Sequence, residues 1–306
     1  HCSRDLREWL THLAATDRLA AAKPGLGLVH ELAAVSDQME LDKAVLFPRP
    51  DGHDMPVVAN LLASRKWIGD CLGVSEDGLI TRYQDAVQNP LPWVEVEDGP
   101  VQAVVHSDVD INGQLPVPTH NELDSGPYIA AGLMISRNPT NGVQNVSIHR
   151  CQISGKDRIG VLLLPRHTWT YSRMAEEAGH ALEVAIVIGV DPASLLASQA
   201  IVPMDFDEME IVGALHGAPV EMVKCKTNNV RVPAHAEIVL EGRVLPGVAE
   251  PEGPFGEFPQ YYGRRANRHV VQVDAITHRK DAIFHTIIGG GMEHLLLGGL
   301  PREATI

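Results

Sequence analysis

The chain has 306 residues, a formal net charge of −14 and a mean hydropathy of −0.04. This length allows two domains with separate hydrophobic cores, and no run of about 18 apolar residues predicts a membrane span. The excess of acidic residues argues against nucleic acid as a partner, because the phosphates would be repelled.

The first 95 residues predict a small N-terminal α/β domain. Leucines and a tryptophan recur near helical spacing over residues 4–22, before Lys23-Pro-Gly25. A second helix is expected over 29–39, a short strand over 43–47 and a further helix over 76–87.

From residue 96 the pattern changes to short β-strands separated by turns, with one predicted helix over 168–181 and a buried strand over 184–190. Closely spaced strands with few helices indicate a barrel-like or split-barrel sheet, so the predicted fold class is α+β with a central domain over 96–300. The other predicted strands cover 101–105, 133–137, 143–148, 159–164, 220–223, 236–240, 268–277 and 282–288.

The cysteines are far apart in the sequence and form no Cys-x-x-Cys pair. We expect reduced thiols in a cytoplasmic protein rather than a disulfide framework or a thiolate zinc site. The N-terminus has no apolar signal region and no initiator Met, so we expect residues to be missing before it. The four cysteines are Cys2, Cys71, Cys151 and Cys225.

The segment Glu252-Gly-Pro-Phe-Gly-Glu257 has a carboxylate at each end of a constrained turn. Proline fixes its own φ, and glycine permits backbone geometry that other residues resist. Such a segment can hold two acidic side chains at a set separation, which proton transfer requires. The alternative is an ordinary surface turn whose glutamates face water.

Three motifs in order, Asn145-x-x-x-x-Arg150, Pro165-x-His167 and the Glu252–Glu257 segment, resemble the UbiD family of decarboxylases. That family uses prenylated FMN and a divalent metal. The resemblance covers roughly residues 100–300. It also includes the segments Asp124–Tyr128, Glu208–Ala214 and Val223–Asn228.

The resemblance implies a split β-barrel of the flavin-reductase kind, preceded by a smaller α/β domain. Family members continue past the position that matches Ile306 into a C-terminal domain that helps them to dimerise. We therefore expect that this domain is absent here, and that residues 301–306 begin a missing segment.

The resemblance also implies that Asn145, His167 and Glu208 are metal ligands. An amide oxygen, an imidazole and a carboxylate suit Mn²⁺ or Mg²⁺ with phosphate oxygens as further ligands, and the family adds K⁺ as another ion. The alternatives are an exposed loop for His167 and a solvated acidic face for Glu208. The residues expected to bind the cofactor are Asn145, Ser147, Ile148, His149, Arg150, Leu163, Arg166, His167 and Glu208.

Arg150 has a planar guanidinium that can bind a substrate carboxylate through two hydrogen bonds; the alternative is a surface salt bridge. The resemblance implies that Glu252 orients Arg150 and that Glu257 donates a proton after CO₂ leaves. A free glutamate is a poor acid at pH 7, so we expect burial beside a second carboxylate to raise the pKa of Glu257.

The resemblance implies a reversible, non-oxidative carboxy-lyase that uses prenylated FMN. Loss of CO₂ from an aromatic, heteroaromatic or α,β-unsaturated acid leaves a carbanion without an electron sink, which a prenylated flavin supplies. The expected partners are that acid, an enzyme that supplies the prenylated flavin, and further copies of the chain in a homodimer or higher homo-oligomer.

Two other functions remain open. The first is a flavin-independent, metal-dependent hydrolase or lyase that uses Asn145, His167 and Glu208 with an open metal position. The second is a non-catalytic chain that binds cofactor but lacks a complete pocket. A Rossmann-type dinucleotide site is not expected, because no glycine-rich phosphate loop occurs.

Overall fold

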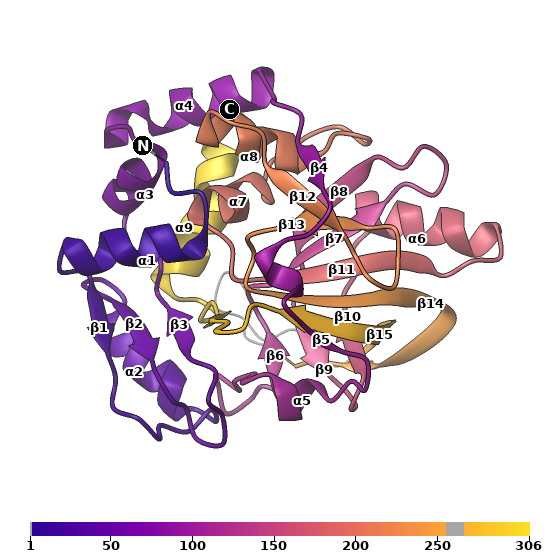
Figure 1. The fold of residues 1–306 in the computed structure, drawn as a ribbon, viewed down its shortest axis with the longest axis horizontal. Coiled ribbons are helices and arrows are strands. Elements are labelled where there is room, and N and C mark those ends of the chain that lie inside the picture. The colour runs from indigo at the N-terminus through magenta and orange to yellow at the C-terminus, as the bar shows by residue number, and fades with distance from the viewer. Residues whose placement is uncertain (1, 255–265) are drawn as a thin grey trace.

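The computed structural model describes residues 2–254 and 266–306, which form three β-sheets and the helices packed around them (Figure 1). A four-stranded sheet belongs mainly to the N-terminal segment. A nine-stranded sheet forms the centre of the molecule, and a three-stranded sheet packs beside it. The predicted α+β class is confirmed by this architecture.

The first helix, α1 (Leu6–Ala15), begins at Asp5, whose carboxylate accepts a hydrogen bond from the Glu8 amide. It ends well before residue 22, because Asp17 has a φ of +55° and the next residues form strand β1 (Leu19–Ala21). The prediction of one helix over 4–22 was therefore wrong in its second half. The other N-terminal elements are α2 (Glu31–Met39), β2 (Ala44–Phe47), β3 (Val57–Ala59), α3 (Arg65–Leu72), the 3₁₀ helix η1 (Glu76–Gly78) and α4 (Leu79–Gln88).

The N-terminal sheet is completed by a strand from much later in the chain. Its order is β1-β2-β3-β16, and β16 (Phe284–His285) pairs in parallel with β3. The Thr286 amide extends this pairing with a 3.0 Å hydrogen bond to the Val58 carbonyl. The predicted strand over 282–288 is thus real but short, and it belongs to a different sheet from its neighbours in sequence.

The large sheet is antiparallel and curled, with the order β6-β9-β10-β15-β14-β11-β7-β8, and β5 adds to β15. Its longest strands form the hairpin β14–β15, which shifts register at Gly242. A Cβ there would lie 2.3 Å from the Gln272 carbonyl oxygen, so only glycine fits. The strands are β5 (Val104–His106), β6 (Tyr128–Ile129), β7 (Leu133–Arg137), β8 (Gln144–Ile148), β9 (Cys151–Ile153), β10 (Arg158–Val161), β11 (Leu182–Ile188), β14 (Ile238–Glu252) and β15 (Ala266–His278).

The small sheet and the remaining helices surround the large sheet. The strand predicted over 101–105 is found only from Val104, because its first residues belong to the 3₁₀ helix η2 (Pro100–Gln102). Among the described helices, none is both long and apolar enough to cross a membrane. The remaining elements are β4 (Val94–Val96), β12 (Glu221–Lys224), β13 (Arg231–Pro233), α5 (Ile111–Gln114), α6 (His167–Glu177), α7 (Pro192–Ala197), α8 (Glu208–His216) and α9 (Met292–Glu303).

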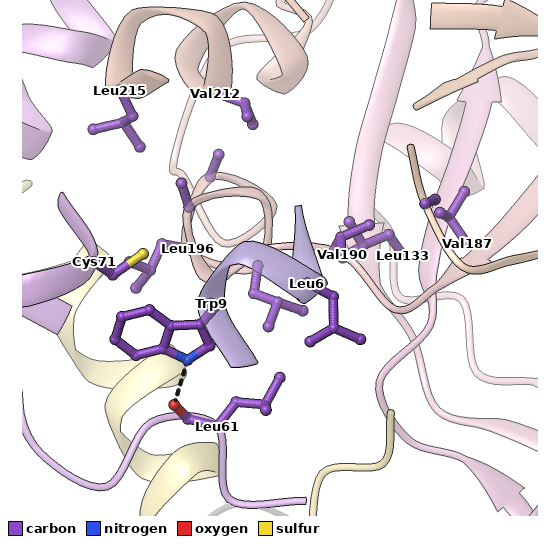
Figure 2. Packing of buried hydrophobic residues seen from close by; sticks show 14 of the residues in the cluster. Leu6, Trp9, Leu61, Cys71, Leu133, Val187, Val190, Leu196, Val212 and Leu215 are labelled. Atoms are coloured by element: carbon purple, nitrogen blue, oxygen red, sulfur yellow. Dashed lines mark hydrogen bonds between the residues drawn. The ribbon is translucent and has the colours of Figure 1, made fainter. Parts of the chain in front are cut away.

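One hydrophobic core joins the N-terminal segment to the large sheet (Figure 2). Trp9 of α1 is fully buried, and its indole nitrogen donates a 2.9 Å hydrogen bond to the Leu61 carbonyl. The same cluster contains Leu133 and Val187 from β7 and β11. All four cysteines are buried free thiols in this structure.

A buried ion pair joins α8 to the start of α7. His216 lies 2.9 Å from an Asp191 carboxylate oxygen, and the other oxygen accepts a 2.6 Å hydrogen bond from the Ser194 hydroxyl. Burial opposes protonation of His216, but the adjacent carboxylate outweighs it and raises the pKa of the imidazole. Burial likewise opposes ionisation of Asp191, but His216 and Ser194 lower its pKa.

This pair makes stability depend on pH. Because the pKa of His216 is raised, its contribution is complete below its unfolded pKa of about 6.5 and is lost as pH rises through the folded pKa. The melting temperature of the His216→Asn variant should therefore fall less between pH 6 and pH 9 than that of the wild type. Thermal unfolding across this range tests the prediction, with His180→Asn at an exposed position as the control. Parallel curves for His216→Asn and the wild type would refute it.

Candidate active site

Strand β8 presents a row of polar side chains on one face. Successive residues of a strand point to opposite sides, so Asn145 and Ser147 share a face while Val146 packs into the core. The strand is held in register by β7, where Asn145 lies opposite Ser136. The result is a polar row next to the first turn of α6.

Asn145 and His167 are in direct contact. Asn145 is buried, and its amide oxygen lies 3.0 Å from Nδ1 of His167, the first residue of α6. The Asn145 amide nitrogen donates to the Thr168 hydroxyl at 3.1 Å. His167 is half-buried at a helix start rather than in an exposed loop, and burial lowers its pKa.

Glu208 reaches the same strand from the first turn of α8. One carboxylate oxygen accepts a 2.7 Å hydrogen bond from the Val146 amide, next to Asn145. The side chain is 3% exposed, so the interpretation of a solvated acidic face is wrong. Within the described part of the chain no lysine or arginine pairs with this carboxylate, and burial raises its pKa well above the ordinary value.

His149 and Ser147 continue the polar row. The Ser147 hydroxyl lies 2.8 Å from Nε2 of His149, and Nδ1 of His149 lies 3.2 Å from the Leu162 carbonyl oxygen. Desolvation of the ring lowers the pKa of His149 to about 4, although the Leu162 carbonyl opposes this shift. The imidazole is therefore neutral at physiological pH.

The other predicted cofactor residues lie around this row. Arg150 is partly buried in the connection between β8 and β9. Ile148 packs against one core cluster and Leu163 is buried in the other, whereas Arg166 is exposed at the N-cap of α6. The structure thus brings Asn145, His167 and the Glu208 contact together, with Arg150 following on the same segment.

The segment that carries the predicted acid pair starts at the end of β14. The Gly253 amide donates to both the Tyr128 hydroxyl and the Gln152 side-chain oxygen, each at 3.1 Å, and Gly253 has a φ of +87° that favours glycine. The Ser125 amide donates a 3.0 Å hydrogen bond to the carbonyl oxygen of Pro254, the next residue. The predicted acid Glu257 lies outside the described residues.

Several of these partners were not identified from the sequence. Tyr128 and Ser125 belong to the Asp124–Tyr128 motif, which carried the family resemblance without a predicted role. Gln152 and Thr168 had no signal of their own, because each acts only through a residue brought near by folding.

Comparison with known proteins identifies the family of the chain. The chain matches the sequence profile of the UbiD family, described as the 3-octaprenyl-4-hydroxybenzoate carboxy-lyase Rift-related domain, over residues 93–292. The N-terminal domain of the same carboxy-lyase matches over residues 10–87. The chain belongs to the UbiD family.

Solved UbiD structures share this fold. An evolved dimeric form of HmfF from Pelotomaculum thermopropionicum, in complex with prFMN, is 47% identical with a TM-score of 0.97; the match covers 99% of this chain and 71% of that one. Apo 3,4-dihydroxybenzoic acid decarboxylase (AroY) from Klebsiella pneumoniae is 30% identical with a TM-score of 0.93; the match covers 99% of this chain and 68% of that one.

A curated UbiD relative is the anhydromevalonate phosphate decarboxylase of Methanothermobacter thermautotrophicus. It is 41% identical over 253 residues, which cover 83% of this chain. The match spans 59% of that relative's length. Together with the α+β architecture, these matches confirm the predicted family and fold class.

Proposed function

We propose that this UbiD chain forms the cofactor-binding and catalytic part of a prenylated-FMN-dependent decarboxylase. Its substrate would be an aromatic, heteroaromatic or α,β-unsaturated carboxylic acid, and the reaction would be reversible. The observation that carries the proposal is the contact of Asn145 with His167 beside the buried Glu208 carboxylate. The 47% identity to a prFMN-bound enzyme supports it.

The three side chains fit a divalent cation. Adjacent ligands about 2.1 Å from an octahedral ion lie about 3.0 Å apart, and the Asn145 oxygen and His167 Nδ1 are separated by 3.0 Å. A buried carboxylate is costly without a positive partner, and a cation beside Glu208 would remove that cost. Mn²⁺ or Mg²⁺ suits this donor set.

Three protein ligands leave octahedral positions for phosphate oxygens. The first N–H groups of a helix have no partner within the helix, and in the described structure the Arg166 side chain makes no capping hydrogen bond to them. The start of α6 can therefore receive part of a flavin phosphate next to the ion. When bound, the prenylated flavin supplies the electron sink for decarboxylation.

The residues of this chain would supply binding and proton transfer. Arg150 would hold the substrate carboxylate through its guanidinium, and Glu252 would orient Arg150. Glu257 would deliver the proton that replaces CO₂. The backbone contacts at Gly253 support this assignment, because they fix the start of the segment that connects the two glutamates.

The proposal is tested with the full-length protein, produced together with a prenyl-flavin-supplying enzyme. Purified protein should show flavin absorption and release CO₂ from a member of a panel of phenolic, furan, pyrrole, indole and cinnamic acids. Protein that binds metal without flavin and hydrolyses or cleaves other substrates would favour the metal-dependent hydrolase or lyase instead.

Substitution of Arg150 by lysine should lower kcat/KM for that acid about 10- to 100-fold, since a charged hydrogen bond contributes about 1.5–3 kcal/mol. Lysine keeps the charge but lacks the planar pair of donors. Arg173→Lys, on an exposed face of α6, is the matched control and should leave kcat/KM unchanged. Equal kcat/KM values for the two variants would remove Arg150 from the proposed site.

A further inference from the structure

His149 begins a chain of hydrogen bonds that ends at Asn145. A carbonyl oxygen can only accept, so the contact between Leu162 and Nδ1 requires the proton of the neutral ring to lie on Nδ1. Nε2 is then an acceptor. The Ser147 hydroxyl, 2.8 Å from Nε2, must therefore donate its proton to His149.

This donation determines what Ser147 offers to Asn145. A serine hydroxyl has one proton, so Ser147 presents only lone pairs to the Asn145 side chain, 3.4 Å away. Those lone pairs attract the amide NH₂ and repel the amide oxygen. The Thr168 hydroxyl can donate or accept, so Thr168 alone would not decide which way the amide faces.

We propose that His149 is a positioning residue that holds the Asn145 amide oxygen toward His167 and so toward a bound divalent cation. The inference rests on the proposed function of the Asn145, His167 and Glu208 group. A reversed amide would present NH₂ to the cation, and a hard cation takes oxygen ligands. The hydrogen bond from His149 to the Leu162 carbonyl therefore determines, through His149 and Ser147, which way the Asn145 amide faces.

The test measures Mn²⁺ affinity by electron paramagnetic resonance on the purified full-length protein with FMN present. His149→Phe keeps an aromatic ring but loses the acceptor, and it should weaken Mn²⁺ binding about 10- to 100-fold, as for other outer partners of metal ligands. His149→Gln can accept from Ser147 through its amide oxygen and should retain most of the affinity.

A double-mutant cycle separates positioning from general damage. Ser147→Ala breaks the same chain one step later, so this single substitution should weaken Mn²⁺ binding. Adding His149→Phe to it should cause little further loss of Mn²⁺ affinity. If His149→Phe does not fold, the Mn²⁺ affinity of Ser147→Ala relative to the wild type still tests the hydrogen-bond chain. Wild-type affinity in either variant, or additive losses in the double variant, overturns the inference. A wild-type protein that binds no Mn²⁺ refutes the proposed function instead.

Discussion

Glu257→Gln is expected to bind flavin as the wild type does and yet to decarboxylate about 10² times more slowly. Glutamine keeps the shape of glutamate but cannot deliver a proton, and a positioned general acid contributes about 10² to 10⁴ in rate. Turnover at matched flavin occupancy measures the effect. Exchange of solvent deuterium into the product carbon should fall with it, because both reactions need the same proton.

Two further variants control this experiment. Glu252→Gln should raise KM as well as lower kcat, because Arg150 would lose the partner that orients it. Glu250→Gln changes a carboxylate two residues earlier in β14 that pairs with Arg158, and its turnover should be normal. Wild-type turnover of Glu257→Gln would exclude Glu257 as the proton donor.

His167→Ala is expected to lose metal and flavin together. With only three protein ligands the metal should bind weakly without the flavin phosphate, and the flavin phosphate should bind weakly without the metal. Elemental analysis of the metal and flavin absorbance after gel filtration measure both losses. His180→Ala, at an exposed position just beyond α6, should retain both.

Chelation gives an independent check on the same assignment. Dialysis of the wild type against a chelator should release flavin as the metal leaves. His167→Ala that kept full flavin content after this treatment would show that the cofactor is held without the predicted metal site, and the role of His167 would have to be abandoned.

Periodic patterns in the sequence predicted most strands of the large sheet. The strand Leu133–Arg137 has the predicted bounds. It is buried on both faces, so its first three residues appear in the sequence as a continuous apolar run that is easily recognised. Helices α7, α8 and α9 were missed, since a helix of only 6 to 12 residues with buried residues on several sides shows no clear apolar period. The pairing of β16 with β3 joins positions more than 200 residues apart, which no local pattern encodes.

The candidate site was predictable to the extent that its residues lie in short motifs. The family resemblance implied that Asn145 and His167 bind one metal, and the structure brings the two side chains to 3.0 Å. The Gly253 contacts with Tyr128 and Gln152 were not expected, because they depend on how β6, β9 and β14 come together. The direction of the Asn145 amide was not expected either, because it depends on contacts with Ser147, Thr168 and His167.

The crossed pairing of β16 with β3 limits how this protein can be recombined. The N-terminal unit ends in sequence near Gln88, but its sheet is complete only with residues 284–286. A chimaera that exchanged only the N-terminal residues with a relative would pair a foreign β3 with the resident β16. Without that strand, β3 would present an open edge to other chains. A chimaera of two relatives must therefore take the N-terminal residues and residues 284–286 from the same parent.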